Sequence, residues 1–123
     1  GRDMALVYMD GKLVNEMMLV NGMARYHSDS TTVREDLKIA QEFAKTNNLG
    51  LFSTKCYQQK ENVENPKCNI KANIDKNTKD RVYYVPGCVQ YKTAIVEKDI
   101  GENWYCSEKE AVEAGFRKSE RCP

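Results

Sequence analysis

The stretch Gly1-Arg2-Asp3-Met4-Ala5-Leu6-Val7-Tyr8-Met9-Asp10-Gly11-Lys12-Leu13-Val14-Asn15-Glu16 decides how the first part of this chain folds. Its apolar run from Met4 to Met9 ends at Asp10-Gly11, and this pattern predicts a strand covered on both faces. Such a strand needs neighbours along both edges, and nothing before it in the sequence provides them. We therefore expect the later part of a larger fold, whose unpaired edges seek another chain in an oligomer or a swapped assembly.

Two helices are expected after this strand. Apolar residues recur at helical spacing from Leu13 to Val20, and Gly22 fits the left-handed residue that ends a helix. Thr32 and Glu35 form a capping-box signature for a second helix, which Asn47-Asn48 stops. Its expected buried face is Val33, Leu37, Ala40 and Ala44, with Phe43 beside it. These apolar stripes are interpreted as core.

Composition limits the partners of the chain. Its 123 residues, 41% hydrophobic and 30% charged, are typical of one folded domain or two small ones. The net charge of +1 predicts that any contact with nucleic acid is local. No apolar run is long enough to cross a bilayer, so no membrane partner is expected.

A second unit is expected beyond a polar segment. Residues 54–67 are interpreted as a linker between a first domain at 1–53 and a small module at 68–123. The alternation from Cys68 to Ile74 predicts a half-buried strand, followed by strands at 81–85 and 94–96. A capping box at Ser107 and Glu110 predicts a short final helix.

Five cysteines are a high count for 14.1 kDa, and they lie in the loop-rich part of the chain. Because no Cys-x-x-Cys pair occurs, disulfides in an oxidising compartment are favoured over a zinc site. The odd number leaves one thiol over, and the spacing alone leaves several pairings open.

Five blocks carry a resemblance to a known family: Gly1-Arg2, the apolar run from Met4 to Met9, Asp10 to Glu16, Leu19 to Ala24 and Leu49 to Ser53. In this order they resemble the second half of a staphylococcal-nuclease-type (thermonuclease) domain, over residues 1–53. The resemblance implies an α+β fold: part of an oligonucleotide-binding (OB) barrel with two helices, joined here to a small disulfide-stapled α+β module. It also implies a Ca²⁺-dependent nuclease in the complete parent protein, acting on DNA or RNA.

The resemblance assigns a catalytic role to Arg2, as one of two arginines that grip the scissile phosphate. A planar guanidinium suits a phosphoryl group whose negative charge grows toward the transition state. It also places Met4, Tyr26 and His27 near a bound nucleotide, although core packing is the alternative for Met4 and Tyr26.

Calcium ligands are not expected in this chain. The family's aspartates and its glutamate precede this region, and the scattered acids Asp3, Asp10, Glu16 and Asp29 form no cluster of oxygens. The chain is therefore expected to be inactive by itself and to bind no metal.

The ending from Glu110 to Cys122 is similar to the Ada-type zinc module of bacterial DNA-repair methyltransferases. Cys88 and Cys122 match two of that module's four cysteines, while Tyr84 and Ser119 occupy the other two places and are poor zinc ligands. The resemblance therefore implies a disulfide between Cys88 and Cys122. Cys68 and Cys106 would form the second, and Cys56 would stay unpaired.

The sequence supports two alternative hypotheses about function. The first is part of a nuclease that is secreted, periplasmic or at the cell surface. The alternative is a noncatalytic module that binds nucleic acid or the cell envelope. Its contact surface would be four aromatic residues, which could instead be core: Tyr83, Tyr84, Tyr91 and Trp104.

Overall fold

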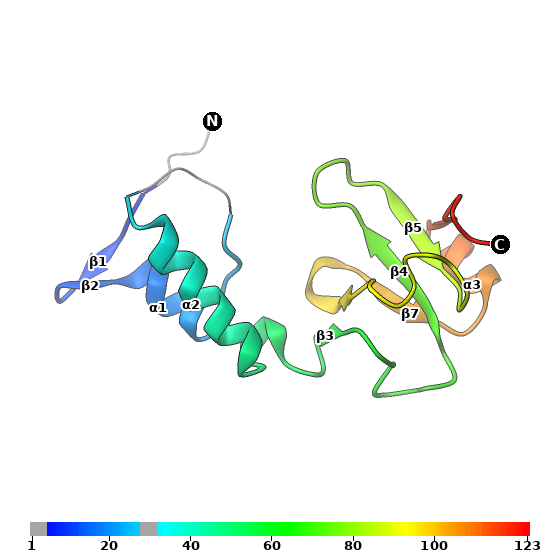
Figure 1. Cartoon of the computed structure of the whole chain (residues 1–123), viewed down its shortest axis with the longest axis horizontal. Helices are drawn as coiled ribbons and strands as arrows, with labels where there is room; N and C mark the ends of the chain where they lie inside the picture. The colour runs from blue at the N-terminus through cyan, green and yellow to red at the C-terminus, as the bar shows by residue number, and fades with distance from the viewer. Residues whose placement is uncertain (1–4, 28–31) are drawn as a thin grey trace. The chain divides into compact units, whose positions relative to one another are not determined.

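The computed structural model describes residues 5–27 and 32–123, and the chain divides into two compact units, Gly1–Ser53 and Thr54–Pro123. Each unit is described by itself (Figure 1). Both combine helices with short strands, so the chain is α+β.

A two-residue hairpin opens the described part of the first unit. Strand β1 (Tyr8–Met9) pairs antiparallel with β2 (Lys12–Leu13). Asp10 and Gly11 both have positive φ, 51° and 75°, as the tightest hairpin turns require. Asp-Gly therefore closes a hairpin here.

The expected strand covered on both faces is wrong for the described residues. The side chains of Val7, Tyr8 and Met9 are 52%, 58% and 60% exposed. Between Ala5 and Met9, β2 is the only strand partner, so no second sheet edge or packed layer covers the apolar run. In the described part of the chain, no closed barrel forms.

Helix α1 (Val14–Val20) and helix α2 (Arg34–Thr46) build the core of this unit and lie side by side in Figure 1. Leu19, Leu37 and Ala40 form a buried cluster between them. Gly22, at φ 68°, ends α1 in the predicted left-handed conformation. The capping box predicted for α2 is wrong: Val33 occupies the cap, and no side chain accepts a hydrogen bond there.

A four-stranded sheet forms the centre of the second unit. Its order is β7 (Asn103–Tyr105), β4 (Ile70–Ile74), β5 (Arg81–Tyr84) and β8 (Arg117–Lys118), antiparallel except for the β5–β8 pair. Helix α3 (Glu108–Glu113) supplies Ala111 to a core that includes Ile70, Ala72, Tyr83 and Phe116.

Half of the predicted capping box of α3 is present, the N-cap bond of Ser107. Ser107 Oγ accepts a hydrogen bond from the Glu110 amide at 3.2 Å. The Glu110 carboxylate in turn accepts from the amide of Cys106 at 2.9 Å, one residue before the cap. Gly115 follows the helix at φ 91°.

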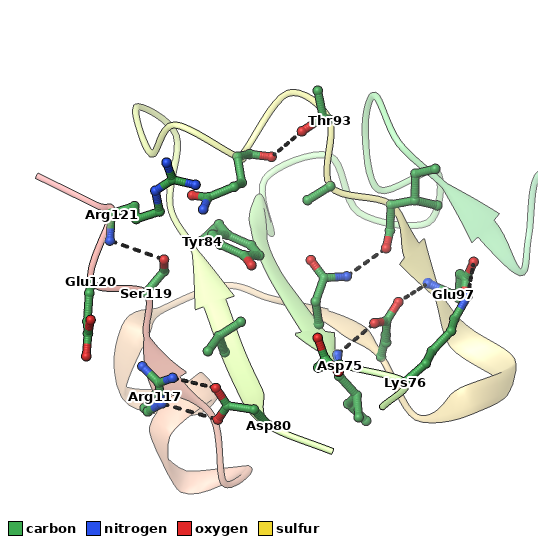
Figure 2. Close-up of a pocket in the computed structure, with 17 residues that line it drawn as sticks. Asp75, Lys76, Asp80, Tyr84, Thr93, Glu97, Arg117, Ser119, Glu120 and Arg121 are labelled. Atoms are coloured by element: carbon green, nitrogen blue, oxygen red, sulfur yellow. Dashed lines mark hydrogen bonds and ion pairs between the residues drawn. The ribbon is translucent and has the colours of Figure 1, made fainter. Parts of the chain in front are cut away.

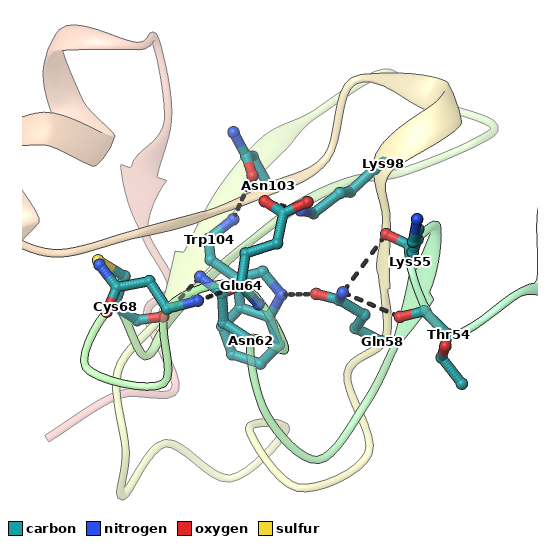
Figure 3. Close-up of polar contacts among 10 residues, drawn as sticks. Thr54, Lys55, Gln58, Asn62, Glu64, Cys68, Lys98, Asn103 and Trp104 are labelled. Carbon is teal, nitrogen blue, oxygen red and sulfur yellow. Dashed lines mark hydrogen bonds and ion pairs between the residues drawn. The ribbon is translucent and has the colours of Figure 1, made fainter.

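The segment expected to be a linker, residues 54–67, packs within the second unit. Strand β3 (Tyr57–Gln58) pairs with β6 (Val96–Glu97), near the strand expected at 94–96. The indole Nε1 of Trp104 donates to Gln58 Oε1 at 2.7 Å, and Gln58 Nε2 donates to the carbonyl oxygen of Thr54 at 2.9 Å (Figure 3). Gln58 Nε2 also donates to the carbonyl oxygen of Lys55 at 3.3 Å, so the buried amide of Gln58 ties residues 54–58 to Trp104 of β7.

Two disulfides cross-link the second unit, Cys68–Cys106 and Cys88–Cys122. Cys56 is a free, half-buried thiol. The first bridge joins Cys68, two residues before β4, to Cys106, which follows β7. The second ties the loop after β5 to the C-terminal segment.

Candidate functional site

The phosphate-gripping residue implied by the family resemblance, Arg2, lies outside the described residues, as does Met4. Their roles therefore stay predictions. What the structure does describe is the segment that follows α1, which carries Tyr26 and His27.

Gly22 positions this segment. The amide of Leu51 donates to the carbonyl oxygen of Gly22 at 2.8 Å, where η1 (Gly50–Phe52) begins. A Cβ on Gly22 would lie 2.1 Å from the Leu49 carbonyl oxygen, and one on Gly50 would lie 2.3 Å from the Gly22 oxygen. The backbones meet so closely that only glycine fits on either side.

The side chain of Tyr26 is half-buried against the helix core and is not fully exposed to solvent. It packs on the cluster of Leu19, Leu37 and Ala40, and its amide donates to Gln41 Oε1 at 2.6 Å. Its hydroxyl is buried and has no hydrogen-bond partner among the described residues. The side chain of His27 is exposed. The structure thus puts the two residues on one segment, with His27 exposed and Tyr26 half-buried.

Two cations flank Phe52, a feature that sequence reasoning missed. Arg25 Cζ lies 5.5 Å and Lys45 Nζ lies 5.6 Å from the centroid of the buried Phe52 ring. Both distances are within range of a cation–π attraction. Because the three residues come from separate segments, no local pattern predicts the cluster. Positive charge is therefore held next to the segment that carries Tyr26.

The donor set of the described residues does not suit calcium. Across residues 5–27 and 32–123, no group of three or more His, Cys, Asp or Glu side chains is placed to hold a metal ion. Hard calcium takes six to eight oxygen ligands. The described residues therefore do not fit a calcium cage, and the cysteines that would have matched a zinc module are joined in disulfides instead.

The aromatic contact surface suggested for the second unit does not form as a set. Tyr83 is 3% and Trp104 is 5% exposed, so both belong to the interior. The Tyr83 hydroxyl donates to Glu108 Oε2 at 2.8 Å; burial, together with this carboxylate, raises the pKa of Tyr83 to about 12. Tyr84 and Tyr91 are half-buried. These rings stabilise the unit, and only two of the four contact solvent appreciably.

Lys71 is the least expected residue of the interior. Its side chain is 1% exposed, and Nζ donates to the carbonyl oxygens of Tyr91 and Ala94 at 2.6 and 2.7 Å. The ammonium also lies 4.6 Å from the Tyr91 ring centroid. Burial lowers the pKa of Lys71 to about 8. The residue holds the loop after β5 onto β4.

No helix in the part of the chain that the structure describes is long and apolar enough to cross a membrane. The two disulfides indicate an oxidising compartment.

Comparison with known proteins gives one family. The model of the staphylococcal nuclease homologue family matches residues 1–54. No curated protein and no solved structure matches the chain. Nothing supports an Ada-type zinc module in the second unit, since the family match stops at residue 54 and the described residues provide no metal cluster. Residues 1–54 are a staphylococcal-nuclease-like segment, which relates this part of the chain to nucleases.

Proposed function

We propose that this chain supplies the later part of the nuclease domain of a Ca²⁺-dependent nuclease that hydrolyses phosphodiester bonds of DNA or RNA. The observation that carries the proposal is the family match over residues 1–54, within which the Gly1-Arg2 pair lies. Arg2 binds the scissile phosphate through its forked guanidinium, and it stabilises the charge that develops there.

In this proposal Met4, Tyr26 and His27 contact the bound nucleotide, and Tyr26 also anchors their segment to the helix core. The described residues do not form a calcium cage. The calcium ligands are therefore assigned to another part of the parent protein, and this chain alone is inactive.

Cleavage of single-stranded DNA in the presence of Ca²⁺ tests the proposal. The assay compares this chain with the same chain extended by whatever the parent gene encodes immediately before Gly1. We expect cleavage only by the extended protein. Arg2→Ala should lower its kcat by about 10²–10³-fold, as the loss of a transition-state donor does. Arg34→Ala, which removes an exposed arginine from the first turn of α2, is the control and should leave the rate unchanged.

Two outcomes contradict the proposal. Cleavage by the 123-residue chain alone would show that its own residues suffice. DNA binding without cleavage by the extended protein would favour the alternative, a noncatalytic module that binds nucleic acid or the cell envelope.

We further propose that the apolar surface of the first unit is covered by another chain. The helices expose Ile39 at 66% and Phe43 at 51%, in addition to the apolar residues of the hairpin. In this proposal they belong to one apolar patch, and soluble monomers rarely expose a large contiguous patch of this kind. Light scattering over a range of concentrations should show an oligomer, and a monomer throughout would contradict this. The disulfides support a secreted or periplasmic protein.

A further inference from the structure

The second unit contains a cavity of about 470 Å³ that the nuclease proposal does not use. Its walls come from β4, β5 and β8, from the loop before β6 and from the segment after β8. Figure 2 shows Tyr84 in the midst of the lining, with Arg117, Asp80, Ser119 and Arg121 to one side of its ring and Asp75, Lys76 and Glu97 to the other. A cavity of this size accommodates a small organic group.

Two neutral oxygens in the cavity lining lack a donor. Asn73 Oδ1 and Gln90 Oε1 are buried and have no hydrogen-bond partner within the described residues. The amide nitrogen of Asn73 donates to the Ile95 carbonyl at 2.7 Å, which fixes the side chain so that the oxygen remains the unpaired atom. A buried acceptor without a donor costs about 1–3 kcal/mol. A ligand that fits here therefore brings N–H groups.

The charge of the lining favours a cation. Five acidic side chains line the cavity against three basic ones, and two of the basic ones are already ion-paired, Lys76 with Glu97 at 3.0 Å and Arg117 with Asp80. The buried Glu102 carboxylate accepts from the amides of Ile74 at 2.7 Å and Glu97 at 2.9 Å. Burial nevertheless raises its pKa, so a cation nearby would stabilise its charged form. Phosphates would meet net negative charge in this cavity.

The cation that fits is organic rather than a metal. Among the described residues, no three His, Cys, Asp or Glu side chains lie close enough together to hold a metal ion. A guanidinium group instead offers five N–H donors in a plane, enough for several separate acceptors, and its flat face stacks on an aromatic ring such as that of Tyr84. Burial, with the charges of Glu102 and Asp80, raises the pKa of Tyr84, so its phenol stays protonated at neutral pH.

We propose that this cavity binds a guanidinium group. The group donates N–H hydrogen bonds to Asn73 Oδ1 and Gln90 Oε1, lies beside Glu102 and stacks on the ring of Tyr84. The group belongs either to free arginine or to an arginine side chain of a peptide. This binding site is independent of the proposed nuclease function and requires no part of it.

The experiment is an NMR titration of the intact 123-residue chain with free arginine, with N-acetyl-arginine amide and with deoxycytidine monophosphate. Arginine or its blocked form should shift the amides of Tyr84, Thr93 and Ser119, which line the cavity. A preference for free arginine identifies a small-molecule ligand, and equal or tighter binding of the blocked form identifies a peptide; either supports the proposal. Shifts at these amides with the nucleotide alone would overturn it, as would the absence of shifts with both arginine compounds.

Two variants test the contacts. Gln90→Met keeps the size of the side chain and removes the unpaired oxygen, and Glu102→Gln removes the charge. Each should weaken arginine binding about tenfold, the loss expected for one hydrogen bond to a charged group. Glu61→Gln, an exposed acid outside the cavity, is the control and should bind unchanged. If Glu102→Gln fails to fold, Gln90→Met decides the matter: wild-type affinity in that variant would overturn the proposal.

Discussion

Gly22 and Gly50 meet backbone to backbone, and this contact joins the end of α1 to the start of η1. A Cβ on either glycine would lie within 2.3 Å of a carbonyl oxygen across the junction. Both residues also have positive φ, 68° and 53°. Steric exclusion and backbone conformation therefore demand glycine at the same two positions.

Gly22→Ala and Gly50→Ala should each destabilise the first unit by about 3 kcal/mol or more, since backbone atoms must move to admit the methyl group. Hydrogen exchange at the amides of α1, α2 and Leu51 measures the effect. Trp104, the only tryptophan, lies in the second unit, so its fluorescence should not change.

Gly11→Ala is the matched control for these variants. Gly11 also has positive φ, 75°, but no atom lies within 4 Å of the added Cβ. The variant should cost only about 1 kcal/mol of backbone strain. An equal loss in all three variants would show that φ alone, and not the close approach, demands glycine at the junction.

Gln58→Leu should destabilise the second unit by about 1–3 kcal/mol, because it leaves the buried indole N–H of Trp104 without an acceptor. Urea unfolding followed by Trp104 fluorescence measures the loss. Gln59→Leu removes an exposed amide that donates to the Lys92 carbonyl at 3.1 Å, and it should change stability by less than about 0.5 kcal/mol. Equal effects would mean that residues 54–67 are not held by this contact.

The stability of the second unit should rise with pH from about 8 because of Lys71. Burial lowers its pKa to about 8 from 10.5, so in this range the unfolded chain holds a proton that the folded chain has released. The free energy of unfolding then increases with pH, by about 1–2 kcal/mol between pH 8 and 9.5, and the unfavourable term is fully present below pH 8.

Lys71→Met should abolish that increase, and Lys67→Met, at an exposed position, should preserve it. The measurement is urea unfolding of the three proteins at pH 7.5 and 9.5. An identical pH dependence in wild type and Lys71→Met would assign the effect to other groups.

Removing the Cys88–Cys122 bridge by a double substitution to serine should cost about 2–4 kcal/mol, as should removing Cys68–Cys106. Cys56→Ser should cost little, since that thiol is free. Peptide mapping without reduction checks the pairing, and a peptide that links Cys56 to Cys68 would contradict it.

Local signals were sufficient where one segment determines its own structure. The left-handed Gly22, the Asp10-Gly11 turn and the Ser107 cap each depend on residues within a few positions. Their physical basis is backbone conformation and short-range hydrogen bonding, which the sequence shows directly.

Burial by distant segments could not be predicted in this way. The alternation from Cys68 to Ile74 predicted a half-buried strand, yet the loop that carries Tyr91 and Ala94 covers Lys71 as well. Gln58 looked like part of a polar linker because its partner Trp104 lies 46 residues away. Asn73 and Gln90, the unpaired acceptors of the cavity, likewise come from separate segments of the chain. No motif or residue spacing therefore predicted the site.

Both disulfides lie in the second unit, Thr54–Pro123, and this asymmetry has a consequence for handling the protein. A reductant such as dithiothreitol would break disulfides in the second unit only. The helical half has no sulfur bridge to lose, whereas the sheet half would have to rely on its small interior alone. Transfer from an oxidising to a reducing milieu would therefore loosen the guanidinium-binding half selectively and leave the nuclease-like half as it was.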